Sequence, residues 1–275
     1  MGPAEEDVMR FSGERWNSAR VLEKVRGQAV SDLELFDTAV DDELLTTISR
    51  EGALKSLHLS SDIVTDDGVI AIVEQCALRS LLLSGVPNVS DRAMGFIARC
   101  ATLCELYLEG TTVSDGSIGK VSQLPELWSL NISDTGVTDV GISRIASRTI
   151  GLLSFEHCRI EGTGISTWRI GEKMSIYGEG SRLTDEGFAV ACASFTRMWN
   201  VIVSNTDVGD EGIKALAGQS PTMLRIDGTR VTKNGVRWIV EHLPVEELQV
   251  NSAQMTEPEA EAYPKPRTLT IYVVD

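Results

Sequence analysis

The chain has 275 residues, a formal net charge of −15 and a hydrophobic fraction of 42%. The excess of acidic residues argues against a nucleic-acid-binding protein, which needs a concentrated basic surface, and the hydrophobic fraction is that of a globular core. Every apolar run is broken well before the ~20 residues that cross a bilayer, and the first ten residues hold no apolar signal segment. The five cysteines, an odd number, are expected to be reduced thiols in a cytoplasmic protein.

The first predicted element is an amphipathic helix between Gly13 and Arg26. Trp16, Ala19 and Leu22 stand there at near-helical spacing, so their side chains share one face. A chain of stacked repeats must cover its terminal hydrophobic face, so we predict an N-terminal helical cap over residues 1–28. The alternative is that this helix binds a partner.

From residue 29 to residue 256 the sequence repeats itself about ten times with a period of 23 to 25 residues. An aliphatic residue marks each copy, and apolar residues follow it five and eight positions later, which places them on one helix face. A short alternating segment precedes each marker and predicts a strand with one buried face. The copies are therefore expected to stack as strand, turn and helix, with parallel strands and the helices on the other side. The markers are Val40, Val64, Val89, Val113, Val137, Ile160, Leu183, Val208, Val231 and Met255.

The copy at residues 127–142 reads Leu-Trp-Ser-Leu-Asn-Ile-Ser-Asp-Thr-Gly-Val-Thr-Asp-Val-Gly-Ile. It resembles leucine-rich repeats, and more narrowly the bacterial variants of the ribonuclease-inhibitor-like and cysteine-containing subtypes, the latter known from F-box proteins. The resemblance covers roughly residues 30–256. It implies an α/β solenoid shaped like a horseshoe, with a parallel β-ribbon on the concave face and helices on the convex face. Thr often replaces the Asn or Cys of the turn and no F-box-like segment is seen, so the role of a ubiquitin-ligase adaptor is not carried over.

The box Thr/Ser-Asp-x-Gly recurs at the expected helix starts, for example as Thr65-Asp66-Asp67-Gly68 and Thr184-Asp185-Glu186-Gly187. Calcium ligands must converge on one ion, and carboxylates spaced one per copy do not, so we interpret the box structurally. The hydroxyl is expected to cap free N–H groups of the helix, and the acids to complement its dipole. The glycine permits close approach to the neighbouring copy.

The sequence contains no constellation typical of a catalytic or cofactor site. It has no Gly-x-Ser-x-Gly, His-Glu-x-x-His, Walker or dinucleotide-binding motif. Cys100 and Cys104 are a weak metal signal beside only three histidines, and Cys76 and Cys100 are expected to pack as small buried thiols at helix ends. We therefore expect no enzymatic activity, no metal and no cofactor.

The outward face of the strands is the expected binding surface. It holds apolar residues where solvent is expected, with acidic residues beside them. Ser175 is expected beside Ile202 in the central row of this face and Tyr177 in the next row, before an insertion of about two residues. The alternative is that single exposed apolar residues have no function. The candidate contact residues are Leu82, Glu105, Tyr107, Glu109, Leu152, Glu156, Tyr177, Ile202, Arg225 and Asp227.

At the carboxyl end, prolines and an alternating segment predict a terminal cap. Pro258, Pro264 and Pro266 are expected to end the helical pattern, and residues 268–273 to form a final strand. We predict a C-terminal cap strand over residues 257–275 and a single domain overall.

Taken together, these features favour a monomeric, cytoplasmic, non-catalytic scaffold that binds a protein partner through its strand face. The net charge favours a basic or mixed partner, and neither nucleic acid nor membrane is an expected ligand. Two alternatives stay open: a regulatory or effector adaptor that engages host or ubiquitin-pathway proteins, and an enzyme whose site follows no known motif. A deep pocket with convergent titratable groups would favour the enzyme.

Overall fold

The computed structural model of the chain describes residues 8–146, 149–168, 173–262 and 268–274. The chain divides into two compact units, Met1–Gly136 and Val137–Asp275. In each unit the strands follow chain order and their described pairs are parallel, and an α-helix or a 3-10 helix leads from one strand to the next. The predicted stack of strand, turn and helix is confirmed.

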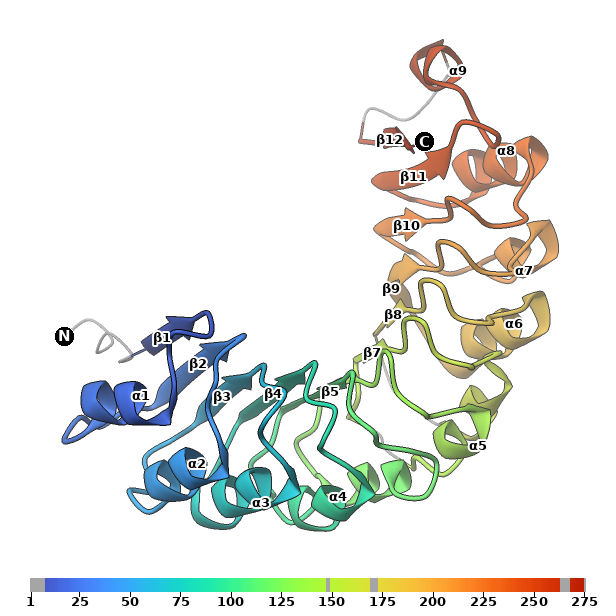
Figure 1. The fold of residues 1–275 in the computed structure, drawn as a ribbon. Helices are drawn as coiled ribbons and strands as arrows, with labels where there is room; N and C mark the ends of the chain where they lie inside the picture. Colours follow the sequence, from blue (N-terminus) through green and yellow to red (C-terminus); the bar gives the residue numbers. More distant parts are fainter. Residues whose placement is uncertain (1–7, 147–148, 169–172, 263–267, 275) are drawn as a thin grey trace, which may run out of the picture. The chain divides into compact units, whose positions relative to one another are not determined.

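In the first unit the strands lie on one side and the helices on the other (Figure 1). Its strands are β1 (Val8–Ser12), β2 (Asp32–Phe36), β3 (Ser56–Leu59), β4 (Ser80–Ser84), β5 (Glu105–Glu109) and β6 (Ser129–Asn131). Its helices are α1 (Ser18–Val25), α2 (Asp42–Ser49), α3 (Asp66–Gln75), α4 (Asp91–Ile97) and the 3-10 helix η1 (Ile118–Gln123). The register places Leu57 between Leu33 and Leu81, so equivalent inward residues of successive copies stack on one another.

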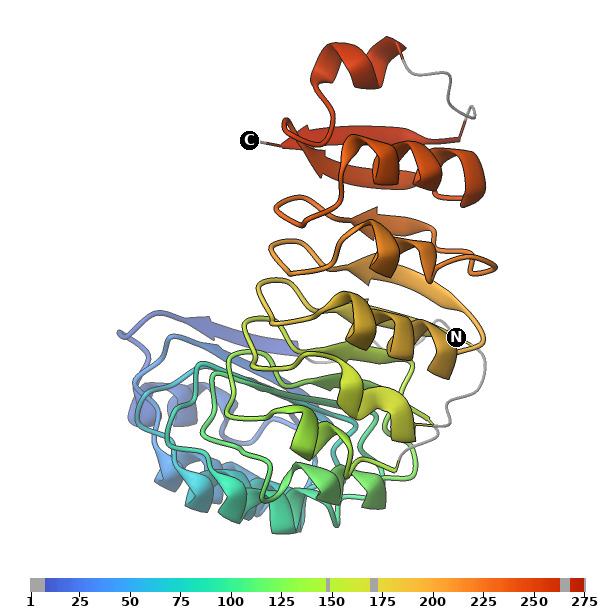
Figure 2. The ribbon, with the colours of Figure 1, turned by 90° about the vertical axis from the view of Figure 1, so that its right-hand side faces the viewer.

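The second unit repeats this arrangement, and Figure 2 shows its helices, yellow to red, stacked one beside the next. Its strands are β7 (Leu152–Ser154), β8 (Met174–Tyr177), β9 (Met198–Ile202), β10 (Met223–Arg225), β11 (Glu247–Asn251) and β12 (Thr270–Val274). Its helices are α5 (Asp139–Ile142), η2 (Thr163–Thr167), α6 (Asp185–Ser194), α7 (Asp210–Lys214), α8 (Lys233–His242) and α9 (Glu257–Ala262). The pairing of β8 with β9 shifts register between Met174 and Ile176.

The aliphatic markers of the repeat lie in the core of both units. Val64 in the first unit and Val208 in the second have no exposed surface, because the strands cover them on one side and the helices on the other. Cys76 and Cys100 are buried as expected, with 4% and 6% of their surfaces exposed. Burial also raises the pKa of Cys192 to about 12, so this thiol stays protonated at neutral pH.

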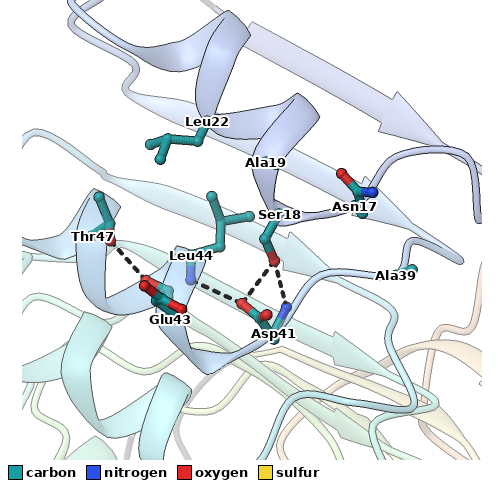
Figure 3. Close-up of a pocket in the computed structure, with 9 residues that line it drawn as sticks. All are labelled: Asn17, Ser18, Ala19, Leu22, Ala39, Asp41, Glu43, Leu44 and Thr47. Carbon is teal, nitrogen blue, oxygen red and sulfur yellow. Dashed lines mark hydrogen bonds between the residues drawn. The ribbon is translucent and has the colours of Figure 1, made fainter.

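The N-terminal cap contains a strand as well as the predicted helix. Strand β1 pairs with β2 in the same register that joins the later copies, and α1 follows it. Figure 3 shows how α1 is attached: the hydroxyl of Ser18 donates to the carboxylate of Asp41 at 2.7 Å, and the Asp41 N–H donates back to that hydroxyl at 3.0 Å. The cap is therefore a strand and helix like the repeats. Its predicted boundary at residue 28 stays a prediction.

At the carboxyl end the predicted final strand is confirmed as β12, but the expectation for Pro258 is wrong. Pro258 is the second residue of α9, where the first turn of a helix leaves its N–H groups without helical partners, so proline is tolerated. Pro264 and Pro266 lie outside the described residues.

A carboxylate joins the start of one helix to the next copy. Asp66 is the first residue of α3, and its side chain accepts the N–H of Ser90 at 2.8 Å and the Ser90 hydroxyl at 2.7 Å. We call this arrangement the aspartate bridge. The same two-point bridge links Asp42 to Thr65, Asp91 to Ser114 and Asp210 to Thr232, with donor–acceptor distances of 2.6 to 2.8 Å.

The hydroxyl of the box also caps its own helix, as predicted. The Thr65 side chain accepts the N–H of Asp67 at 3.2 Å while its hydroxyl donates to the preceding aspartate. Burial raises the pKa of the Asp91 carboxyl, but hydrogen bonds from Ser114 and Ser117 outweigh this effect and hold it below its ordinary value. The bridge from Asp91 is therefore made by an ionised carboxylate.

The glycine of the box leaves room for the aspartate of the preceding copy. A Cβ on Gly68 would overlap the Asp42 carboxylate and would lie 3.1 Å from the Asp42 Cα. Gly212 faces Asp185 and Gly235 faces Asp210 in the same way. The predicted close approach is confirmed, and the group that approaches is the bridging carboxylate.

Replacing Asp66 by alanine is expected to lower the free energy of unfolding by about 2–3 kcal/mol, because it leaves buried N–H groups at the start of α4 without a hydrogen-bond acceptor. Asp67→Ala is the matched control, since Asp67 is exposed and its ion pair with Arg92 lies at the surface; we expect a loss below about 1 kcal/mol. Urea denaturation followed by circular dichroism measures both. Equal losses would contradict the bridge.

A pair of glycine substitutions tests the steric role of the box. Gly68→Ala is expected to destabilise the protein by about 1–3 kcal/mol through overpacking against Asp42. Gly95→Ala in α4 meets nothing nearer than the Lys120 Nζ at 3.5 Å, so the better helix former is expected to stabilise the protein by up to about 1 kcal/mol. Thermal unfolding should shift in opposite directions, and a shared direction would refute the explanation.

Candidate functional site

The strand face of the first unit brings two predicted contact residues together. Leu82 in β4 and Tyr107 in β5 are directly paired across the two strands, and both side chains are half-buried. Glu105 and Glu109 stand two residues before and after Tyr107 in the same strand, so all three project from the same face. The sequence-based grouping of these four residues therefore matches the structure.

Neighbouring polar side chains hold the two glutamates in place. The Ser80 hydroxyl donates to the Glu105 carboxylate at 2.8 Å, and the Asn131 amide donates to the Glu109 carboxylate at 3.4 Å. Neither glutamate forms an ion pair within the described residues. Their negative charges thus stay available to a partner.

The apolar strip extends further than the sequence indicated. His58 is paired with Leu82 on the next strand, and the ring of Phe36 meets the His58 ring edge-on at 4.4 Å between centroids. Burial lowers the pKa of His58, although Glu34 and Glu109 oppose the shift, so the imidazole is neutral at physiological pH. Phe36, His58, Leu82 and Tyr107 form what we call the aromatic strip.

On the strand face of the second unit, the expected positions of Ser175 and Ile202 are wrong. The register shift in β8 places Tyr177, not Ser175, beside Ile202, and Arg225 stands on the other side. Only 6% of the Ile202 surface is exposed, because longer side chains flank it on both neighbouring strands. Ile202 therefore supports this surface from beneath and does not project from it, whereas Tyr177 and Arg225 remain half-exposed.

A hollow of about 210 Å³ lies on this face, lined by Met223, Arg225, Glu247, Gln249 and Tyr272. Next to it the Asp227 carboxylate accepts the Ser204 hydroxyl at 2.7 Å and the Gln249 amide at 2.9 Å. Asp227 therefore orients the polar wall of the hollow. The sequence analysis did not predict this hollow, although the alternating pattern gives the outward direction of its side chains.

The remaining predicted residues and two exposed tryptophans lie beside these surfaces. Leu152 in β7 is paired with Ser175, and Glu156 follows that strand; both are half-buried. Trp128 is 46% exposed, and Trp199 is 40% exposed with the Lys173 Nζ 2.8 Å from its ring centroid. Neither tryptophan is predicted by the alternating pattern, because each stands one residue before the outward positions.

A further hollow, shown in Figure 3, lies between α1 and α2 and has a volume of about 470 Å³. Leu22 and Leu44 form apolar walls, and Asp41 is already engaged by Ser18 and by the N–H of Leu44. Across the described ranges, His, Cys, Asp and Glu residues form no group of three or more that could hold a metal ion. The described helices include none that is long and apolar enough to span a membrane.

Known proteins share this architecture. A family model described as Leucine Rich repeat matches residues 127–146 and 201–217. An internalin, InlF, from Listeria monocytogenes superposes with a TM-score of 0.56 at 17% identity, over 90% of this chain and 76% of that chain. Rad7, in its yeast complex with Elc1, gives a TM-score of 0.53 at 15% identity, over 88% and 74% of the two chains. No curated protein matches the sequence.

These identities show the fold and no more, and the proposed subtype stays a prediction. The matched segments begin at buried apolar residues, at Leu127 just before β6 and at Val201 in β9. Together with the parallel strands and the periodic helices, these matches show that the chain has the fold of a leucine-rich-repeat solenoid.

Proposed function

We propose that the protein is a non-catalytic scaffold that binds another protein through the strand face of its first unit. The observation that carries the proposal is the pairing of Leu82 with Tyr107 in the aromatic strip. A leucine-rich-repeat solenoid is a common scaffold for protein interaction, and its strand side presents one row of side chains after another. The aromatic strip supplies the apolar anchor that such an interface needs.

The charges around the strip select a basic or mixed partner. Glu105 and Glu109 flank Tyr107, and Glu34 lies one strand from His58. The Arg10 guanidinium binds Glu34 and lowers the pKa of that carboxyl, so this acid is already paired. The two glutamates beside Tyr107 are the groups that a partner's Lys or Arg would reach.

The second unit supports the same function with a different surface. Tyr177 and Arg225 stand one strand to either side of the buried Ile202, and Leu152, Glu156 and Asp227 lie on or beside the same face. Tyrosine and arginine are the residue types that interface energies depend on most. The hollow at Met223 and Tyr272 gives a side chain of the partner a place to enter.

The test is to capture a partner from the source lysate, purify the pair and measure its affinity by calorimetry. Leu82→Ala combined with Tyr107→Ala is expected to weaken binding at least about tenfold, because it removes the proposed apolar anchor. Circular dichroism first confirms that the variant folds.

Ile63→Ala is the matched control, since Ile63 is 51% exposed but follows β3 outside the aromatic strip. It should leave the affinity unchanged within about twofold. Equal affinities of the wild type and the Leu82/Tyr107 variant would show that the strip is not the binding surface.

A further inference from the structure

The segment of residues 13–27, which contains α1, carries a charge opposite to that of the rest of the chain. Residues 13–27 hold four basic and two acidic side chains, a charge of +2, which leaves −17 for the remaining residues. Arg15, Arg20, Lys24 and Arg26 are all exposed. A positively charged patch on an otherwise acidic protein attracts partners of the opposite charge from those that the acidic surface attracts.

Helix α1 separates its side chains by direction. Val21 and Val25 are buried against the repeat core, and Ala19 and Leu22 face α2 (Figure 3). Arg20 and Lys24 stand four residues apart in α1 and so share a third direction, and Trp16, just before the helix, lines the same hollow. This third face is the one left for contacts outside the unit.

A shallow hollow of about 420 Å³ lies along this third face, lined by Arg15, Trp16, Arg20, Glu23 and Lys24. We call it the cap hollow. The Trp16 ring is held by Phe11, edge-on at 4.8 Å, and the Arg15 guanidinium lies 5.8 Å from its centroid. The hollow thus combines a fixed aromatic wall with several cations.

Within the described residues, the cations of the cap hollow form no strong ion pairs. Lys24 lies 3.8 Å from Glu23, an exposed contact that contributes little. One Arg20 nitrogen donates to the Arg15 carbonyl at 2.6 Å, which fixes the guanidinium and leaves its charge uncompensated. No described acid from another element forms an ion pair with Arg15 or Arg20.

We propose that the cap hollow is a second docking surface, which binds an acidic segment of a protein partner. Carboxylates of that segment would pair with Arg20 and Lys24, and an apolar side chain would pack on Trp16. This surface is separate from the aromatic strip and selects a partner of the opposite charge.

The structure favours an acidic protein segment over two other anionic ligands. A helix that lies on a membrane needs an exposed apolar face, and α1 buries its valines in the core. A nucleic acid presents a long row of phosphates, and the charge of −17 outside residues 13–27 would repel it. A short acidic segment fits the small extent of the cations.

Fluorescence anisotropy with a labelled peptide of glutamates around one central leucine tests the proposal on the full chain. The peptide should bind, and Arg20→Glu combined with Lys24→Glu should weaken binding at least about tenfold. Raising the salt from about 50 to about 500 mM should also weaken binding, because the charges are exposed. If the reversal variant does not fold, Arg20→Gln with Lys24→Gln takes its place.

Arg197→Glu combined with Arg237→Glu is the matched control, because it changes the net charge equally at exposed sites of the second unit. It should bind the peptide within about twofold of wild type. Equal binding by the two reversal variants would overturn the proposal. So would binding of single-stranded DNA or phosphatidylserine vesicles, but not the peptide, in an Arg20-dependent manner.

The acids Glu5, Glu6 and Asp7 precede β1, and the same assay tests them as an internal occupant. Peptide binding by the full chain supports an external partner. Peptide binding only after deletion of residues 1–7 would assign the cap hollow to the chain's own segment and overturn the proposal. None of these outcomes involves the aromatic strip.

Discussion

The aspartate bridge is the interaction on which the helix side of each unit depends. A helix begins with N–H groups that have no helical partner, and burying them against a neighbouring copy costs free energy unless an acceptor reaches them. The carboxylate of Asp66 supplies that acceptor to the next copy and makes a second hydrogen bond to the Ser90 hydroxyl. A copy that carries the bridging aspartate therefore completes the helix start of its successor, and the box Thr/Ser-Asp-x-Gly contacts the copies before and after its own.

The copy at residues 160–168 shows what happens when the bridge is missing. The Asp139 carboxylate still reaches it and accepts the N–H groups of Glu161, Gly162 and Gly164. Gly162 stands where the next aspartate would be, so the Thr184 N–H donates to the Glu161 carbonyl at 3.2 Å instead. The backbones meet so closely that a Cβ on Gly187 would overlap that carbonyl. This copy contains a 3-10 helix, as does the copy of η1, which receives the bridge from Asp91.

The sequence was sufficient to predict the repeat, because burial on both sides of a stack imposes one apolar pattern on every copy. It also indicated that Thr65 caps a helix, since that role is local. It could not show that Asp66 meets Ser90, because residues 24 positions apart come together only through stacking. The predicted neighbour of Ile202 was wrong for a related reason. A register shift in β8 changes which residue stands beside Ile202, and sequence spacing alone does not locate such a shift.

The candidate surfaces lie on the outward side of the strands because the residues that stack the copies lie on the other side. The bridges and the inward aliphatic residues carry the stacking, so the outward strand residues are freer to vary without loss of the fold. In the first unit that freedom is used for Leu82 and Tyr107 beside two glutamates, whereas in the second it is used for Arg225 and Tyr272 around a hollow. One stacking rule can thus present chemically different faces, because the forces that build the copy act on the other side of the strand.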